Sequence, residues 1–86
     1  MNLITFLKCN EGRINCLKTL DDGRLAAGDQ NSNLIIYNKE TFNPEITIKN
    51  NLSGLCNFTQ LKNKNIACSF TSHYTIKIIK IKNNKL

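Results

Sequence analysis

The fold is indicated by a stretch that occurs twice in this chain of 86 residues. Residues 14–28 read INCLKTLDDGRLAAG, and residues 55–69, 41 positions further on, read LCNFTQLKNKNIACS. Apolar residues recur in register between the two copies: Ile14 with Leu55, Leu17 with Phe58, Leu20 with Leu61, Leu25 with Ile66, and Ala26 with Ala67. Such a pattern indicates that one supersecondary unit is present in two copies.

Each unit is composed of short strands. The apolar runs are rich in Ile and Leu, are bounded by Asn, Asp, Gly or Lys, and show no sustained helical period. Asp21, Asp22 and Gly23 predict a tight turn, since Asp and Gly tolerate the positive φ values that two-residue hairpins demand, and residues 62–65 occupy the same place in the second copy. We predict strands at residues 3–8, 14–19, 24–27, 34–38, 45–49, 54–59, 65–69 and 75–81.

A repeat of about 40–45 residues made of four short strands is typical of β-propeller blades. We therefore predict an all-β fold of two four-stranded antiparallel units, a partial β-propeller, with the first repeat at residues 1–41 and the second repeat and a basic tail at 42–86. Residues 34–37 and 76–79 are mostly apolar on both faces, whereas a sheet with one wet face should alternate. Two blades cannot close a ring. The sequence leaves open a segment of a longer propeller, a subunit of a homo-oligomer, or a poorly folding truncated product.

The charge of the chain admits two interpretations. A net charge of +6 is compatible with an anionic partner, which makes a small basic β module that binds nucleic acid the alternative function. However, the lysines are spread along the chain, and there are 10 Lys against only 2 Arg. Nucleic-acid sites usually depend on Arg and on stacking aromatic residues. The composition therefore disfavours nucleic acid as the partner.

The four cysteines do not form a metal motif. Cys9, Cys16, Cys56 and Cys68 lack the paired C-x-x-C spacing of structural zinc sites, and most of them lie in or beside apolar runs. We expect no metal and no cofactor, and reduced cysteines in a cytoplasmic protein. No apolar run approaches the roughly 18–20 residues of a membrane span, so no membrane association is expected.

Several segments resemble the WD-repeat family of β-propellers over nearly the whole chain. DDGRLAAG at residues 21–28 is similar to the hairpin of that family, and residues 31–38 (NSNLIIYN) and 73–80 (HYTIKIIK) resemble its D-x-T-I-x-I-W-D ending. Residues 3–8 and 45–49 resemble the strand that closes the preceding blade. The resemblance implies a propeller segment whose loops and rim bind other proteins.

The repeats depart from the family pattern at its buried polar network. The resemblance places Asn10 and Asn51 where the family has His, Asn31 and His73 where it has Asp, and Tyr37 and Ile79 where it has Trp. Asn can still bridge backbone groups, but a less connected polar network should rigidify a blade less. The repeats are therefore interpreted as degenerate.

No arrangement of residues indicates catalysis. His73 is the only histidine, and no Ser or Cys has an evident base near it in sequence. We expect a non-catalytic protein–protein interaction scaffold whose protein or peptide partner is not indicated by the sequence. Phe42, with Lys39 and Asn43 in the same polar loop, is the candidate partner-binding rim.

Overall fold

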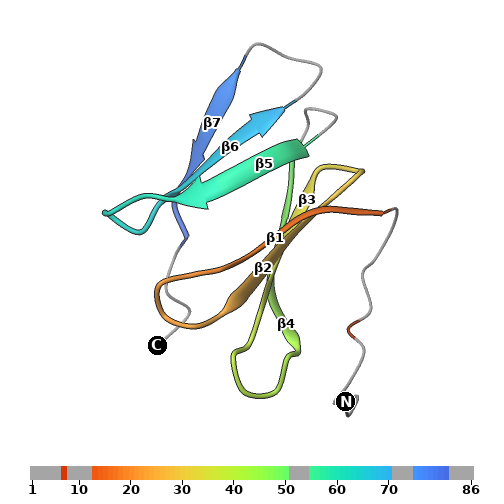
Figure 1. Cartoon of the computed structure of the whole chain (residues 1–86), viewed down its shortest axis with the longest axis vertical. Helices are drawn as coiled ribbons and strands as arrows, with labels where there is room; N and C mark the ends of the chain where they lie inside the picture. The colour runs from red at the N-terminus through yellow and green to blue at the C-terminus, as the bar shows by residue number, and fades with distance from the viewer. Residues whose placement is uncertain (1–6, 8–12, 51–54, 71–74, 82–86) are drawn as a thin grey trace.

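The computed structural model describes residues 7, 13–50, 55–70 and 75–81. These residues form two antiparallel sheets and no helix (Figure 1). The strands are β1 (Ile14–Thr19), β2 (Leu25–Asp29), β3 (Asn33–Tyr37), β4 (Pro44–Lys49), β5 (Leu55–Gln60), β6 (Ile66–Phe70) and β7 (Ile76–Ile79). The predicted all-β fold is confirmed.

The strands follow each other as two antiparallel meanders. The first sheet has the order β1-β2-β3-β4 and the second the order β5-β6-β7. β4 begins the second predicted repeat and pairs with β3 in the first sheet, which is the place that the resemblance implies for residues 45–49. The second sheet has three strands among the described residues, where four were predicted. The strand predicted at residues 3–8 lies outside the described residues except for Leu7, which is not in a strand.

The sequence repeat is also a repeat of strand pairing. Each cross-strand pair of β1, β2 and β3 has its counterpart in β5, β6 and β7, and the register irregularity near the start of the first hairpin recurs too. The counterparts include Leu17↔Ala27 with Phe58↔Cys68, Ala26↔Ile36 with Ala67↔Ile78, and Gly28↔Leu34 with Ser69↔Ile76. The two sheets are therefore copies of one unit, residue by residue.

The first turn of each copy also repeats. Residues 20–24 connect β1 to β2, and the predicted tight turn lies there, closed by a hydrogen bond of 2.8 Å from the Leu20 amide to the Arg24 carbonyl. Gly23 has a φ of 93°, and Lys64 at the equivalent position has a φ of 78°. The amides of both residues donate at 2.9 Å to the carbonyl of the leucine three positions earlier. A left-handed residue is thus required at this place, and only the first copy meets the requirement with glycine.

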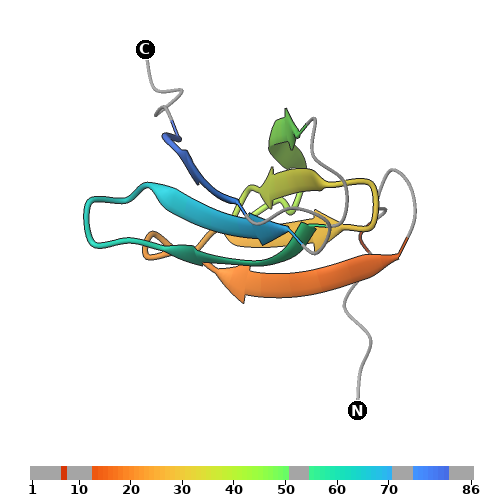
Figure 2. The same cartoon turned by 90° about the horizontal axis from the view of Figure 1, so that it is seen from above.

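The two sheets pack through one face each, which we call the inner faces. The first sheet contributes Ala26, Leu34 and Ile36, and the second contributes a larger set: Leu55, Phe58, Ile66, Cys68 and Phe70. β5 packs against β1 and β2 (Figures 1 and 2). A β-carbon at Gly28 would lie 2.6 Å from Leu55 Cδ2 and 2.8 Å from Cys16 Sγ. The absence of a side chain at residue 28 therefore sets how closely the sheets approach.

The outer face of the first sheet is apolar as well. Ala27, Ile35 and Tyr37 form a second buried cluster there, with Leu25 and Leu7 packed against it. Leu25 and Tyr37 are paired across β2 and β3, as are Ala27 and Ile35. β3 is consequently buried along its whole length, which explains why its sequence does not alternate.

Replacing Ile66 by Ala should destabilise the fold by about 2–5 kcal/mol, because Ile66 is fully buried between the sheets and truncation leaves a cavity. Ile14→Ala is the matched control, since Ile14 is 38% exposed, and it should cost less than about 1 kcal/mol. Urea unfolding monitored by circular dichroism measures both. Equal losses for the two variants would contradict the assigned core.

Gly28→Ala should destabilise the chain by about 1–3 kcal/mol, because the added methyl group meets the side chains of buried Leu55 and of Cys16, which must move to make room for it. The control is Ser69→Ala, which alters the equivalent position of the second copy without enlarging it and should change stability by less than about 0.5 kcal/mol. The same unfolding measurement applies. A neutral Gly28→Ala variant would disprove the close approach.

Candidate functional site: a charged cleft between the two turns

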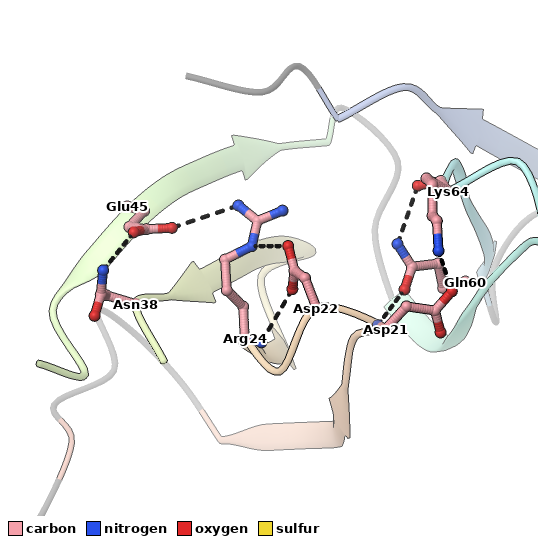
Figure 3. A network of polar contacts seen from close by, with 7 residues as sticks. All are labelled: Asp21, Asp22, Arg24, Asn38, Glu45, Gln60 and Lys64. Carbon is pink, nitrogen blue, oxygen red and sulfur yellow. Dashed lines mark hydrogen bonds and ion pairs between the residues drawn. The ribbon is translucent and has the colours of Figure 1, made fainter. Parts of the chain in front are cut away.

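A cleft of about 400 Å³ opens where the turns of the two sheets meet. It is lined by residues of the β1–β2 turn, the start of β4, the end of β5, the β5–β6 turn and the chain after β7: Asp21, Asp22, Arg24, Glu45, Gln60, Lys64 and Ile81. Figure 3 shows six of these side chains together with Asn38. The cleft is built by both copies of the repeat, so it depends on their packing.

The two turns are joined directly on one side of the cleft. The backbone amide of Asp21 donates to Gln60 Oε1 at 2.7 Å, and Lys64 Nζ lies 2.9 Å from Asp21 Oδ2 (Figure 3). Gln60 Nε2 also donates to the carbonyl of Lys64 at 3.2 Å. The Lys64–Asp21 ion pair is well exposed and is therefore worth little by itself. The amide contacts of Gln60 fix the relative position of the turns.

Arg24 organises the other side. Its Nε lies 2.8 Å from Asp22 Oδ2 and its Nη1 lies 3.4 Å from Glu45 Oε1, while its side chain is mostly buried. Glu45 in turn accepts a hydrogen bond of 2.7 Å from Asn38 Nδ2 (Figure 3). The guanidinium thus links the β1–β2 turn to β4, and the hydrogen bond from Asn38 links Glu45 to the β3–β4 loop.

The pKa of Asp22 lies below its ordinary value of 3.8. Slight burial acts to raise this pKa, but the backbone hydrogen bond from Arg24, its charge and its side-chain hydrogen bond outweigh burial, and Lys39 adds a smaller lowering. The carboxylate of Asp22 is therefore stabilised in its charged form. The effect of Lys39 also shows that this lysine lies near the cleft.

The predicted rim residues belong to the loop beside this cleft. The Lys39 side chain runs alongside the turn, with its Cδ 3.5 Å from where a β-carbon of Gly23 would lie. Phe42 has a φ of 62°, is 37% exposed, and donates its amide to the Asn38 carbonyl at 3.0 Å. The Asn43 carbonyl accepts the Asn38 amide at 2.8 Å. The structure thus places Lys39, Phe42 and Asn43 in one loop that Asn38 anchors to Glu45.

The predicted polar network of the repeats is only partly described. Asn10, Asn51 and His73 lie outside the described residues. Asn31 is exposed in the β2–β3 turn, whereas Tyr37 is buried on the outer face of the first sheet. Their placement gives no indication of a binding site.

A buried polar cluster at the β2–β3 turn was missed by the sequence analysis. Asp29 is fully buried and accepts hydrogen bonds of 2.9 Å from the amides of Asn31 and Asn33. Ser32 Oγ accepts the amide of Leu55 at 3.1 Å, and Asn50 Nδ2 donates to the Ser32 carbonyl at 2.9 Å. The sequence D-x-x-S-N at residues 29–33 is a recognisable turn signal. The cluster ties the first sheet to the start of the second, which is a structural role.

The described cysteines do not indicate nucleophilic chemistry. Burial, together with a smaller contribution from the neighbouring Cys16, raises the pKa of Cys68 to about 11, although Lys77 acts to lower it. Such a thiol stays protonated and unreactive at neutral pH. Within the described part of the chain, no group of His, Cys, Asp and Glu is arranged to hold a metal ion. The same residues include no helix long and apolar enough to cross a membrane.

Comparisons with protein-family models, with curated proteins and with solved structures gave no match for this chain.

Asp22 should make stability depend on pH in the acid range. Because its pKa is lowered in the folded state, its stabilising contribution is complete above the unfolded pKa and is lost as the pH falls below about 3.8. Asp22→Asn should therefore be less stable than the unmodified chain at pH 6, by less than about 1 kcal/mol because Asp22 is about half exposed, and the difference should shrink at pH 3. Urea titrations at both pH values measure it. A difference that is unchanged at pH 3 would contradict the ionic role.

Proposed function

We propose that this chain is a non-catalytic protein-interaction scaffold, a segment of a WD-repeat-like β-propeller, and that it binds a protein segment at the charged cleft and the adjoining β3–β4 loop. The exact repetition of strand pairing and the family resemblance of residues 21–28 support the propeller segment. The binding role is carried by one observation, which is a charged cleft whose Glu45 is hydrogen-bonded to the loop that carries the exposed Phe42.

The charges of the cleft favour a basic protein segment over nucleic acid. Asp21, Asp22 and Glu45 outnumber the cations Arg24 and Lys64 there, although the whole chain carries +6. A phosphate backbone would meet carboxylates at this position, whereas a Lys or Arg of a peptide would find acceptors. Phe42 and Ile81 offer apolar surface next to those charges. We infer a ligand that combines a basic with an apolar side chain.

Peptide display provides the test. A library of linear 12-residue peptides selected on the purified chain should enrich sequences that pair Lys or Arg with an aromatic or aliphatic residue. Glu45→Gln should weaken the selected peptides by about tenfold, measured by fluorescence anisotropy, because it removes one carboxylate of the cleft. Glu40→Gln is the comparison variant, since it removes the same charge from the β3–β4 loop outside the cleft lining, and it should weaken the peptides less than Glu45→Gln does.

The same variants distinguish peptide binding from the alternative function, which is binding of nucleic acid. A labelled 20-nucleotide single strand should bind the Glu45→Gln variant more tightly than the unmodified chain if phosphates occupy the cleft, and its affinity should fall steeply with salt. Peptides that bind both glutamine variants equally well, or an oligonucleotide that binds more tightly than any selected peptide, would overturn the proposal.

A further inference from the structure

The outer face of the second sheet carries apolar residues that nothing in the described chain covers. Ile76 is 72% exposed and Ile78 is 54% exposed, and both are paired with small residues of β6, Ser69 and Ala67. A hollow of about 230 Å³ lies at this face, and its lining includes Ala67, Ser69 and Ile76. Isoleucines this exposed on adjacent positions of one face indicate an interaction surface.

The equivalent face of the first sheet is covered by another sheet. Strand pairing makes Leu34 the counterpart of Ile76 and Ile36 the counterpart of Ile78. Both counterparts are 0% exposed, because they face the second sheet. The outer face of the second sheet is therefore the repeat equivalent of the inner face of the first.

The face of the second sheet that covers Leu34 and Ile36 also has an equivalent in the first sheet. Leu34 and Ile36 pack in one cluster with Phe58 and Ile66 of the second sheet. Strand pairing makes Leu17 the counterpart of Phe58, and Leu25 the counterpart of Ile66. These counterparts belong to the outer face of the first sheet, opposite Ala27 and Tyr37. The two sheets are therefore packed head to tail, with unlike faces in contact.

We propose that the outer face of the second sheet binds the outer face of the first sheet of a second copy of this chain. The contact continues, between chains, the interface that already joins the two sheets within one chain. It deepens the scaffold function proposed above by naming one partner, but it uses a surface other than the charged cleft.

The described residues at both faces fit this arrangement. Leu17 is 59% exposed, whereas its counterpart Phe58 is only 3% exposed in the inter-sheet core. Leu55, which packs against the backbone at Gly28, has Ile14 as its counterpart, and Ile14 is partly exposed. Ile14 and Leu17 of the second copy would thus occupy the hollow beside Ser69 and the surface of Ile76 and Ile78.

Three features weaken the association relative to the contact inside the chain. Leu7 packs against the outer cluster of the first sheet and must be displaced by the second copy. Ser69 carries a side chain where Gly28 has none, so the sheets cannot approach as closely as they do at Leu55. Two copies with +6 each also repel one another, and this repulsion is screened by salt. We therefore expect a reversible association in the micromolar range that strengthens between 50 and about 300 mM NaCl.

Sedimentation velocity of the full chain from about 5 to 500 μM tests the proposal. The unmodified chain should associate with increasing concentration, and Ile78→Asp and Leu17→Asp should each weaken the association at least tenfold. Both replaced residues are more than half exposed, so both variants should keep the melting temperature of the dilute protein. Phe42→Asp is the control, because it changes an exposed apolar residue outside the two faces and should leave the association intact.

Mixing the two interface variants tests the head-to-tail arrangement itself. The Ile78→Asp variant has an unaltered outer face on its first sheet, and the Leu17→Asp variant has an unaltered outer face on its second sheet. An equimolar mixture should therefore form a 1:1 dimer that does not associate further. A chain that stays monomeric up to 500 μM, variants that associate like the unmodified chain, or a mixture that stays monomeric would each overturn the proposal. Glu45→Gln should leave the association unchanged, and Ile78→Asp should leave peptide binding unchanged. The proposal for the cleft and the proposal for the sheet face are therefore tested independently.

Discussion

The contact between the two sheets at Gly28 and Leu55 is the constraint on which the rest of the structure depends. Because residue 28 has no β-carbon, Leu55 can press against β2, and this approach brings Phe58 and Ile66 onto Leu34 and Ile36. The same approach brings together the two turns that form the charged cleft. The buried amide contacts of Ser32 with Leu55 and Asn50 lock the chain at the opposite end of the sheets. The hydrophobic core and the charged cleft thus both depend on the close approach of the two sheets at Gly28 and Leu55.

Much of the fold could be predicted from the sequence, because strand formation and repetition are local properties. The strand predicted at residues 14–19 coincides with β1, and the other predicted strands that are described overlap with observed ones. The equivalence of Leu25 with Ile66 and of Ala26 with Ala67 is confirmed by the pairing of both sheets. The tight turn at residues 21–23 could also be predicted, because Gly readily adopts the positive φ found at Gly23.

The candidate site could not be predicted in the same way, because it is created by residues far apart in the chain. Asp21 meets Gln60 and Lys64 only after the sheets have packed, and no local pattern indicates that encounter. The rim residues Lys39 and Phe42 were found from composition, but the nearness of Lys39 to the β1–β2 turn was not. Asp29 differs in this respect: its partners are the amides of Asn31 and Asn33 and the Asn33 side chain, so its turn could be recognised locally, but its complete burial in the fold could not.

Differences between the copies show which contacts the second sheet can make. Ile35 of β3 is replaced by Lys77 at the equivalent position of β7, next to Cys68 on the inner face. A lysine that points inward from an edge strand discourages pairing with a further strand, since pairing would enclose its charge. β7 is the edge of the second sheet in the described residues, so Lys77 protects that edge while Ile76 and Ile78 leave the opposite face apolar. The second sheet is therefore suited to specific stacking through its outer face, while Lys77 protects its β7 edge against unspecific strand addition.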